Sequence, residues 1–272
     1  TFDLSELSTI TTTGSPLSPE SFDFVYNSFK SDVHLASICG GTDIISCFVG
    51  ASPIDPVFKG EIQKAGLGMD VDVYDDDGQA LINFPGELVC KNSFPSMPLG
   101  FWNDDNNEKY LASYFSKYKN IWHQGDFAVK TKNNGYVVQG RSDTTLNPGG
   151  VRIGTSEIYR QIETINEIEA SVVVELAKGP DVEVILFVML MDGCKLDENL
   201  HQKIKSRIRE QASPRHVPDK IFACPDIPHT KSGKISEQAV KNALNNIEAE
   251  NLSALDNPES LDFFFQFSNG LN

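Results

Sequence analysis

The sequence has little of what a membrane-spanning or nucleic-acid-binding protein needs. No apolar run approaches the ~20 residues of a transmembrane helix. Basic residues are scarce, with 23 lysines and arginines against 38 acidic residues and a formal net charge of −15. Nucleic-acid-binding proteins usually carry a basic face, so this charge argues against general nucleic-acid binding. It leaves room for an anionic ligand held by a local group of arginines.

Cysteine and histidine are also sparse. The five cysteines are scattered without a C-x-x-C pair, and the five histidines show no metal-ligand spacing. This pattern predicts reduced thiols in a cytoplasmic protein rather than a disulfide framework or a zinc site. The 272 residues, 40% of them hydrophobic, are enough for one large or two modest domains with a real core.

The most informative stretch is 140–154, which contains two arginines, one acid and four glycines. Glycines permit unusual backbone angles and a close approach of a ligand, and arginines offer planar donors to phosphate and sugar oxygens. Pro148, Gly149 and Gly150 break regular structure, so the segment is predicted to be a loop. From its residues alone, this loop is either an ordinary connection or a functional joint between two bodies.

Gly140-Arg141-x-Asp143, followed by Gly150-x-Arg152-Ile153, resembles the hinge motif of adenylate-forming enzymes, which include acyl-CoA synthetases, peptide-synthetase adenylation domains and luciferases. The resemblance extends from about Gly14 to the C-terminal tail. It implies an α+β chain in which residues 1–142 form the C-terminal, β-rich part of the large AMP-binding domain. Residues 143–272 would form a small, mobile α+β lid domain with a tail.

The resemblance also indicates that the chain is a fragment. The Ser/Thr/Gly-rich phosphate loop that this family carries upstream is not found in the sequence, which does not begin with Met. We therefore expect a C-terminal part of a longer enzyme, inactive by itself.

Several residues of the first half acquire roles from the family pattern. Gly14, Ser15 and Pro16 would contact the adenine ring, Thr42 would bond the α-phosphate, and Asp43, where the family has Glu, would hold Mg²⁺. Magnesium prefers carboxylate oxygen, which suits an acid at this place. From the residues alone, the same stretch also fits a simple turn with Asp43 as a helix cap.

Gly40 bears on the acyl substrate. In acetyl-CoA synthetases, the position two before this threonine is a tryptophan that closes the pocket around acetate. A glycine there would admit a longer acid, such as four-carbon acetoacetate, and one methylene in such a pocket is worth ~1–3 kcal/mol. The alternative is that Gly40 serves only the backbone.

Gly125-Asp126 ends a predicted strand and offers a carboxylate to a pair of vicinal hydroxyls. The resemblance implies that Asp126 binds the two ribose hydroxyls and that Arg141 is a second ribose contact. His123 is expected to be structural, because an ionised carboxylate that attacks ATP needs no proton removed.

Beyond residue 142, the family pattern makes Asp143 the hinge residue and Arg152 a phosphate contact. Gly149 and Gly150 would line the pantetheine tunnel of CoA, and Arg209 would lie near its 3′-phosphate. Arg209 belongs to a predicted amphipathic helix with four cations, and such charges are also typical of an ordinary solvated helix face.

Pro228-x-Thr230-x-x-Gly233-Lys234 matches a third family motif. Lys234 would bridge the substrate carboxylate and the α-phosphate and offset charge as pyrophosphate leaves. The Walker pattern is not satisfied, because Ile235 follows the lysine. Without the other motifs, an exposed loop lysine would be the simpler interpretation.

Together these features predict an ATP-dependent acid–CoA ligase that uses ATP, Mg²⁺ and CoA. A carboxylate would attack the α-phosphate to give an acyl-adenylate, and the CoA thiol would then displace AMP. The alternatives are another short- or medium-chain acyl-CoA synthetase, a peptide-synthetase adenylation domain, or a non-catalytic nucleotide-binding module.

Overall fold

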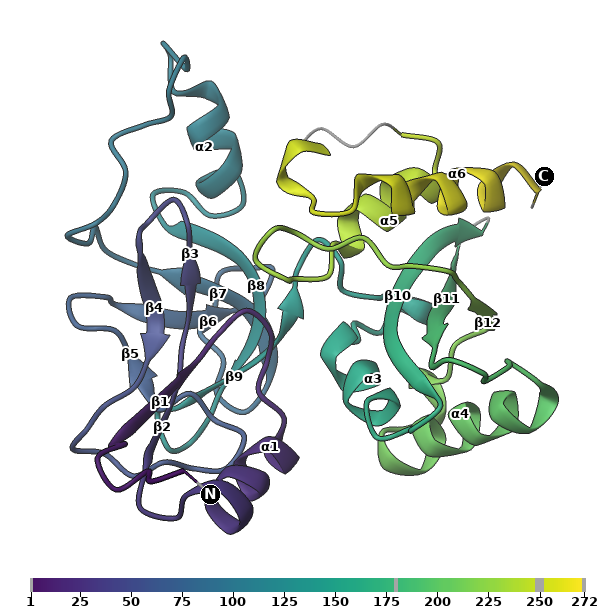
Figure 1. The fold of residues 1–272 in the computed structure, drawn as a ribbon. Coiled ribbons are helices and arrows are strands. Elements are labelled where there is room, and N and C mark those ends of the chain that lie inside the picture. The colour runs from purple at the N-terminus through teal and green to yellow at the C-terminus, as the bar shows by residue number, and fades with distance from the viewer. Residues whose placement is uncertain (1, 179–180, 248–251, 271–272) are drawn as a thin grey trace. The chain divides into compact units, whose positions relative to one another are not determined.

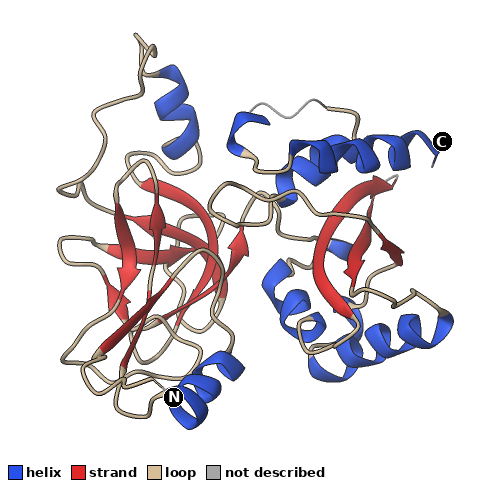
Figure 2. Ribbon diagram, viewed as in Figure 1, coloured by secondary structure: helices blue, strands red, loops and turns tan. Residues whose placement is uncertain are grey.

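The computed structural model describes residues 2–178, 181–247 and 252–270, which form two compact units (Figure 1). Unit 1 is Thr1–Ser142 and unit 2 is Asp143–Asn272. Both units mix helices and strands, which confirms the α+β class (Figure 2). No helix in the described ranges is long and apolar enough to cross a membrane.

Unit 1 is built from three small sheets. One is a parallel pair, and the other two are antiparallel, in the orders β3-β4-β5 and β6-β7-β8-β9. The strands are β1 Thr9–Thr12, β2 His34–Ser37, β3 Cys39–Gly41, β4 Ser46–Gly50, β5 Lys64–Ala65, β6 Val71–Tyr74, β7 Pro85–Cys90, β8 Trp122–Lys130 and β9 Tyr136–Arg141.

The core of unit 1 is rich in aromatic residues. Trp122 of β8 is 2% exposed and contacts the rings of Phe48 and Phe94. The short helix α2, Glu108–Tyr114, adds further rings to this core, and Tyr114 stacks on Trp122 with the ring centroids 3.8 Å apart. These contacts attach α2 to the strand that carries Asp126.

The first helix of unit 1 begins where the sequence predicts. Helix α1, Pro19–Phe24, has proline at its first position, and the Ser18 hydroxyl accepts a hydrogen bond from the Ser21 N–H at 3.3 Å. The chain continues as a π-helical turn, η1, over Val25–Phe29.

Unit 2 is one three-stranded sheet covered on both faces. Its antiparallel strands are β10, Ile168–Lys178, and β11, Asp181–Leu190; β12, Lys220–Ala223, runs parallel to β11. The helices are α3 Thr155–Ile162, α4 Glu198–Gln211, α5 Glu237–Leu244 and α6 Leu261–Gly270, with short 3-10 segments η2 Pro148–Gly150, η3 Pro214–His216, η4 Leu252–Ala254 and η5 Pro258–Ser260.

Alternation along β10 divides the core of unit 2 into two layers. Val173 packs with α3 and α4, whereas Val172 and Val174 pack with α5 and α6. Successive strand residues point to opposite faces, so an almost continuous apolar run is the sequence pattern of a sheet buried on both sides. The loops that connect these elements carry the candidate residues of unit 2.

Candidate functional site

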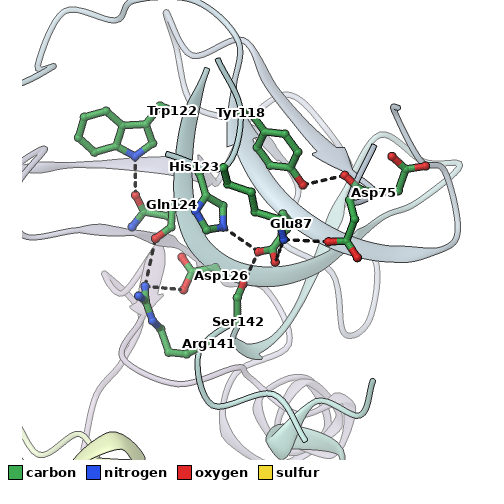
Figure 3. A network of polar contacts seen from close by, with 11 residues as sticks. Asp75, Glu87, Tyr118, Trp122, His123, Gln124, Asp126, Arg141 and Ser142 are labelled. Atoms are coloured by element: carbon green, nitrogen blue, oxygen red, sulfur yellow. Dashed lines mark hydrogen bonds and ion pairs between the residues drawn. The ribbon is translucent and has the colours of Figure 1, made fainter. Parts of the chain in front are cut away.

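Asp126 and Arg141 lie opposite each other on the β8–β9 hairpin (Figure 3). An Arg141 guanidinium nitrogen is 3.4 Å from a carboxylate oxygen of Asp126, and the same nitrogen donates to the Gln124 carbonyl at 3.1 Å. Gly125, with φ +78°, makes this approach possible, because a Cβ there would lie 2.7 Å from the guanidinium. The structure therefore brings the two predicted ribose contacts together.

Asp126 is also the acceptor for a buried thiol. Cys39 of β3 donates to its second carboxylate oxygen with a sulfur–oxygen distance of 3.6 Å. Burial and the Asp126 charge raise the pKa of Cys39 far above the usual range of a thiol, so the sulfur stays protonated and remains a donor. Asp126, only 7% exposed, is thus fixed from two sides.

Thr42 and Asp43 stand on the exposed turn that joins β3 to β4. The Ile45 N–H closes the turn on the Thr42 carbonyl at 3.1 Å, and a strand follows rather than a helix. The interpretation of Asp43 as a helix cap is therefore wrong. Its carboxylate instead accepts a short hydrogen bond from the Tyr114 hydroxyl.

Gly40 has a clear backbone role. A Cβ at this position would lie 2.0 Å from the Ser46 carbonyl oxygen and 2.6 Å from Cys47 Cα, closer than any side chain tolerates. The bulge in the β3–β4 pairing brings the strands this near. This geometry supports the interpretation that Gly40 serves the backbone, and its role in an acyl pocket stays a prediction.

Gly14, Ser15 and Pro16 form an exposed loop just beyond β1. The last residue of β1, Thr12, pairs with Ser37 and accepts a hydrogen bond from the Ile38 N–H at 3.0 Å. The loop therefore begins at the end of the parallel pair from which the chain enters β3. Within the described ranges, no hydrogen bond or ion pair joins this loop to Asp126.

A buried acid lies beside this group. It belongs to Gly86-Glu87-Leu88, a family signature that the sequence led us to interpret as structural and not as part of the site. Glu87 of β7 is 2% exposed and accepts hydrogen bonds from Lys117 at 2.7 Å, from His123 at 3.0 Å and from the Ser142 hydroxyl (Figure 3). Burial opposes its ionisation, but these donors prevail and lower the pKa of Glu87 to about 2. An acid inside the apolar strand Pro85–Cys90 is the sequence signal that could have revealed it.

The candidate loop of unit 2 begins with Asp143, which is exposed. The segment between Leu146 and Ile153 is closed by an antiparallel bridge, so that Gly149 and Gly150 stand near its tip. Both have positive φ, +59° and +76°, and a Cβ on either would meet nothing within 4 Å. Arg152 is exposed on the returning side of this loop.

Lys234 lies on a second exposed loop of unit 2, after Gly233 with φ +80°. Its N–H donates to the Thr230 hydroxyl at 3.1 Å, and its carbonyl accepts from the Thr230 N–H at 2.8 Å. Its ammonium makes no ion pair with any residue the structure describes. Arg209 is equally exposed on α4 and likewise has no ion-pair partner in the described part of the chain.

Over the described residues, no group of three or more His, Cys, Asp or Glu side chains could enclose a metal ion. Asp43 therefore offers a metal one exposed carboxylate. That arrangement fits Mg²⁺, which is commonly bound through one or two carboxylates together with ligand phosphates and water.

No protein-family model matches the chain. It is 55% identical over 264 residues to the acetoacetyl-coenzyme A synthetase of Rhizobium meliloti (strain 1021), covering 97% of this chain and 41% of that protein. The acetoacetyl-CoA synthetase of Xenopus tropicalis is 45% identical over 266 residues, 97% of this chain and 40% of its own length.

A solved structure agrees with these relatives. The acetoacetyl-CoA synthetase from Streptomyces lividans superimposes with a TM-score of 0.91 at 40% identity, covering 99% of this chain and 42% of that one. Over almost its whole length the chain is therefore homologous to acetoacetyl-CoA synthetases. It spans about 40% of the length of the curated relatives it matches.

Proposed function

We propose that this chain forms part of an enzyme that joins acetoacetate to CoA at the expense of ATP, through an acyl-adenylate. The Asp126–Arg141 pair carries the proposal, because a carboxylate fixed beside a guanidinium suits a ribose with its neighbouring phosphate. The names of the relatives supply the acid, acetoacetate.

In this proposal, unit 1 binds the nucleotide. Asp126 accepts hydrogen bonds from the two ribose hydroxyls, and Arg141 adds a donor at the sugar. The exposed hydroxyl of Thr42 donates to the α-phosphate. The loop of Gly14, Ser15 and Pro16 contacts the adenine ring, for which exposed backbone and a proline face are suited.

Asp43 would hold Mg²⁺ in this arrangement. The ion would supply positive charge to offset the phosphate oxygens as pyrophosphate forms. Asp43 would present one carboxylate oxygen to the ion, while its other oxygen accepts the hydrogen bond from the Tyr114 hydroxyl.

Unit 2 would supply the residues that change between the two half-reactions. Lys234 stands on an open loop, so its ammonium can reach the substrate carboxylate and the α-phosphate during adenylate formation. Asp143, the first residue of unit 2, would be the hinge, and Arg152 would contact phosphate.

Two open glycines and one arginine of unit 2 would serve CoA. Gly149 and Gly150 have space in place of side chains, which suits the wall of a tunnel for the pantetheine arm. Arg209, whose guanidinium lacks an ion-pair partner in the described ranges, would lie near the 3′-phosphate.

Nucleotide binding without catalysis is the second candidate function for this chain by itself. It is favoured by the share of the relatives that the chain covers, 41% of the Rhizobium meliloti protein. Titration of AMP onto the chain tests the nucleotide site in both cases. The chain should bind AMP, and Asp126→Asn should weaken binding at least about tenfold, because a charged acceptor of two hydroxyls is lost.

Asp105→Asn is the matched control, because Asp105 is an exposed acid of unit 1 outside the site. Equal AMP affinities for the Asp126→Asn chain and the unaltered chain would contradict the nucleotide site. The acid is tested on the full-length protein, where AMP release should be faster with acetoacetate than with acetate or propionate. A preference for another acid would leave a different short-chain acyl-CoA ligase.

A further inference from the structure

Tyr114 connects the exposed turn of Asp43 to the core of unit 1. Its hydroxyl donates to Oδ2 of Asp43, and its ring stacks on Trp122 with centroids 3.8 Å apart and planes inclined by 16°. Asp43 and Tyr114 are separated by 71 residues in the chain. The phenol is thus fixed at its ring end by a buried indole and joined at its other end to the acid.

The indole is itself held in place. Trp122 is 2% exposed, and its N–H donates to the side-chain carbonyl of Gln124 at 2.9 Å (Figure 3). The backbone carbonyl of Gln124 accepts from Arg141 at 3.1 Å. A continuous series of contacts therefore runs from Asp43 through Tyr114 and Trp122 to the Asp126–Arg141 pair.

The chemistry of the phenol fits a permanent donor. A phenol is protonated at neutral pH, so the Tyr114 hydroxyl is a hydrogen-bond donor and the Asp43 carboxylate is its acceptor. Asp43 Oδ2 accepts the hydrogen bond from this hydroxyl, whereas Oδ1 has no hydrogen-bond partner among the residues the structure describes. An exposed aspartate would otherwise sample several rotamers, and one fixed hydrogen bond selects among them.

We propose that Tyr114 is a positioning residue that holds the Asp43 carboxylate, with Oδ2 anchored and Oδ1 left for a magnesium–nucleotide ligand. The inference rests on the proposed function, since it assigns Asp43 to the metal. It adds a residue of α2 that does not touch the ligand and acts through the acid. Ligand sites need such support, because a group that is free to rotate must be ordered again each time the ligand binds.

The test is ATP titration onto the chain with and without Mg²⁺, comparing the gain in affinity that the metal gives. Tyr114→Phe keeps the stacked ring and removes only the hydroxyl, so that gain should fall about tenfold, as expected for one hydrogen bond to a charged group. Asp43→Asn should abolish the gain. Near-ultraviolet circular dichroism of the Trp122 region should stay unchanged in Tyr114→Phe.

Tyr110→Phe is the matched control. Tyr110 lies in the same helix and the same aromatic cluster, but its hydroxyl donates to the Pro98 carbonyl at 2.7 Å. If Tyr114→Phe keeps the full gain while Asp43→Asn loses it, the positioning inference is overturned and the proposed metal site stands. If Asp43→Asn also keeps the gain, or the unaltered chain binds no ATP, the proposed function of this site fails and the inference fails with it.

Discussion

Side chains hold two acids of the candidate site in unit 1, whereas most candidates of unit 2 are exposed on loops. Asp126 is fixed by Arg141 and Cys39, and Asp43 by Tyr114. Lys234 is exposed, and in the described part of the chain its hydrogen bonds are made by its own backbone N–H and carbonyl with Thr230. A fixed group binds a ligand with little further ordering, and an open loop can adopt new positions. The contrast agrees with the proposed roles, in which unit 1 binds the nucleotide and unit 2 supplies the residues that change between the half-reactions.

The largest effect should come from removing the buried acid that organises unit 1. Glu87→Ala removes the acceptor that His123 and Lys117 share, although Lys117 keeps its ion pair with Asp76 at 3.0 Å. Removing one partner of a buried ion pair in this way costs about 3 kcal/mol of unfolding free energy. Urea denaturation measures the loss. Lys59→Ala removes an exposed ion pair with Asp23 and should cost less than about 1 kcal/mol. Equal losses of unfolding free energy in the two variants would show that the Glu87 contacts stabilise unit 1 no more than an exposed ion pair does.

The contribution of Glu87 to stability should also depend on pH. The pKa of Glu87 is lowered to about 2, below the ~4.3 of an unfolded glutamate, so its contribution to stability is complete above the unfolded value. That contribution is lost as the pH falls from about 4.3 to about 2. Thermal unfolding of the unaltered chain and of Glu87→Gln, followed from pH 6 to pH 2, should converge over this window. Parallel curves would rule out the depressed pKa.

Unit 2 also has polar contacts in its interior. The Tyr159 hydroxyl donates to Glu237 at 2.6 Å and accepts from the Val173 N–H at 3.1 Å. Tyr159→Phe should therefore lower the unfolding free energy by about 2 kcal/mol, because an N–H is left unsatisfied in the core. Tyr74→Phe provides the comparison, since the Tyr74 hydroxyl makes no hydrogen bond with any residue that the structure describes. A stability unchanged by Tyr159→Phe would mean that water replaces the phenol.

The loop of Gly149 has room for a side chain, but its backbone angle disfavours any residue other than glycine. Gly149 has φ +59° with nothing within 4 Å of a Cβ, so Gly149→Ala should cost about 1 kcal/mol from the left-handed backbone alone. Gly193→Ala, at φ +82° in an equally open place, should cost the same. In the full-length protein only Gly149→Ala should raise the KM for CoA. An equal rise in the KM for CoA in Gly193→Ala would show that the effect is not specific to the loop of Gly149.

The smallest effect on stability should come from Lys234. Its side chain is exposed, so Lys234→Ala should change the unfolding free energy by less than about 0.5 kcal/mol. Pyrophosphate release by the full-length protein should nevertheless fall by more than tenfold, since the ammonium offsets charge in the reacting complex. Lys231→Ala, on the same loop, should alter neither quantity. A loss of unfolding free energy without slower pyrophosphate release would show that Lys234 supports the fold rather than the reaction.

Local signals in the sequence predicted much of the fold. Ser18 caps α1, and Leu200, Ile204 and Ile208 form the buried face of α4, as their spacing indicates. The helical spacing of Phe22, Val25, Tyr26 and Phe29 predicts one buried face, but Phe29 is 46% exposed. The helix changes to a π-helical turn over Val25–Phe29, which shifts the residue off the face predicted by the 3.6-residue period.

The site was predictable only where a motif is contiguous. Asp126 and Arg141 stand in recognisable short motifs, and the β8–β9 register places them opposite each other. The partners of Asp43 and Glu87 come from residues 30 to 71 positions away. Such contacts depend on strand register and helix packing, neither of which a single sequence determines.

The approach of Ser46 to Gly40 limits how this protein can be redesigned. Any side chain at position 40 would collide with a carbonyl 2.0 Å from its first carbon, so a library at this site would first select for an altered hairpin. Its surviving members would report backbone repair rather than substrate preference. A search for variants with a different acyl substrate should therefore begin at another position.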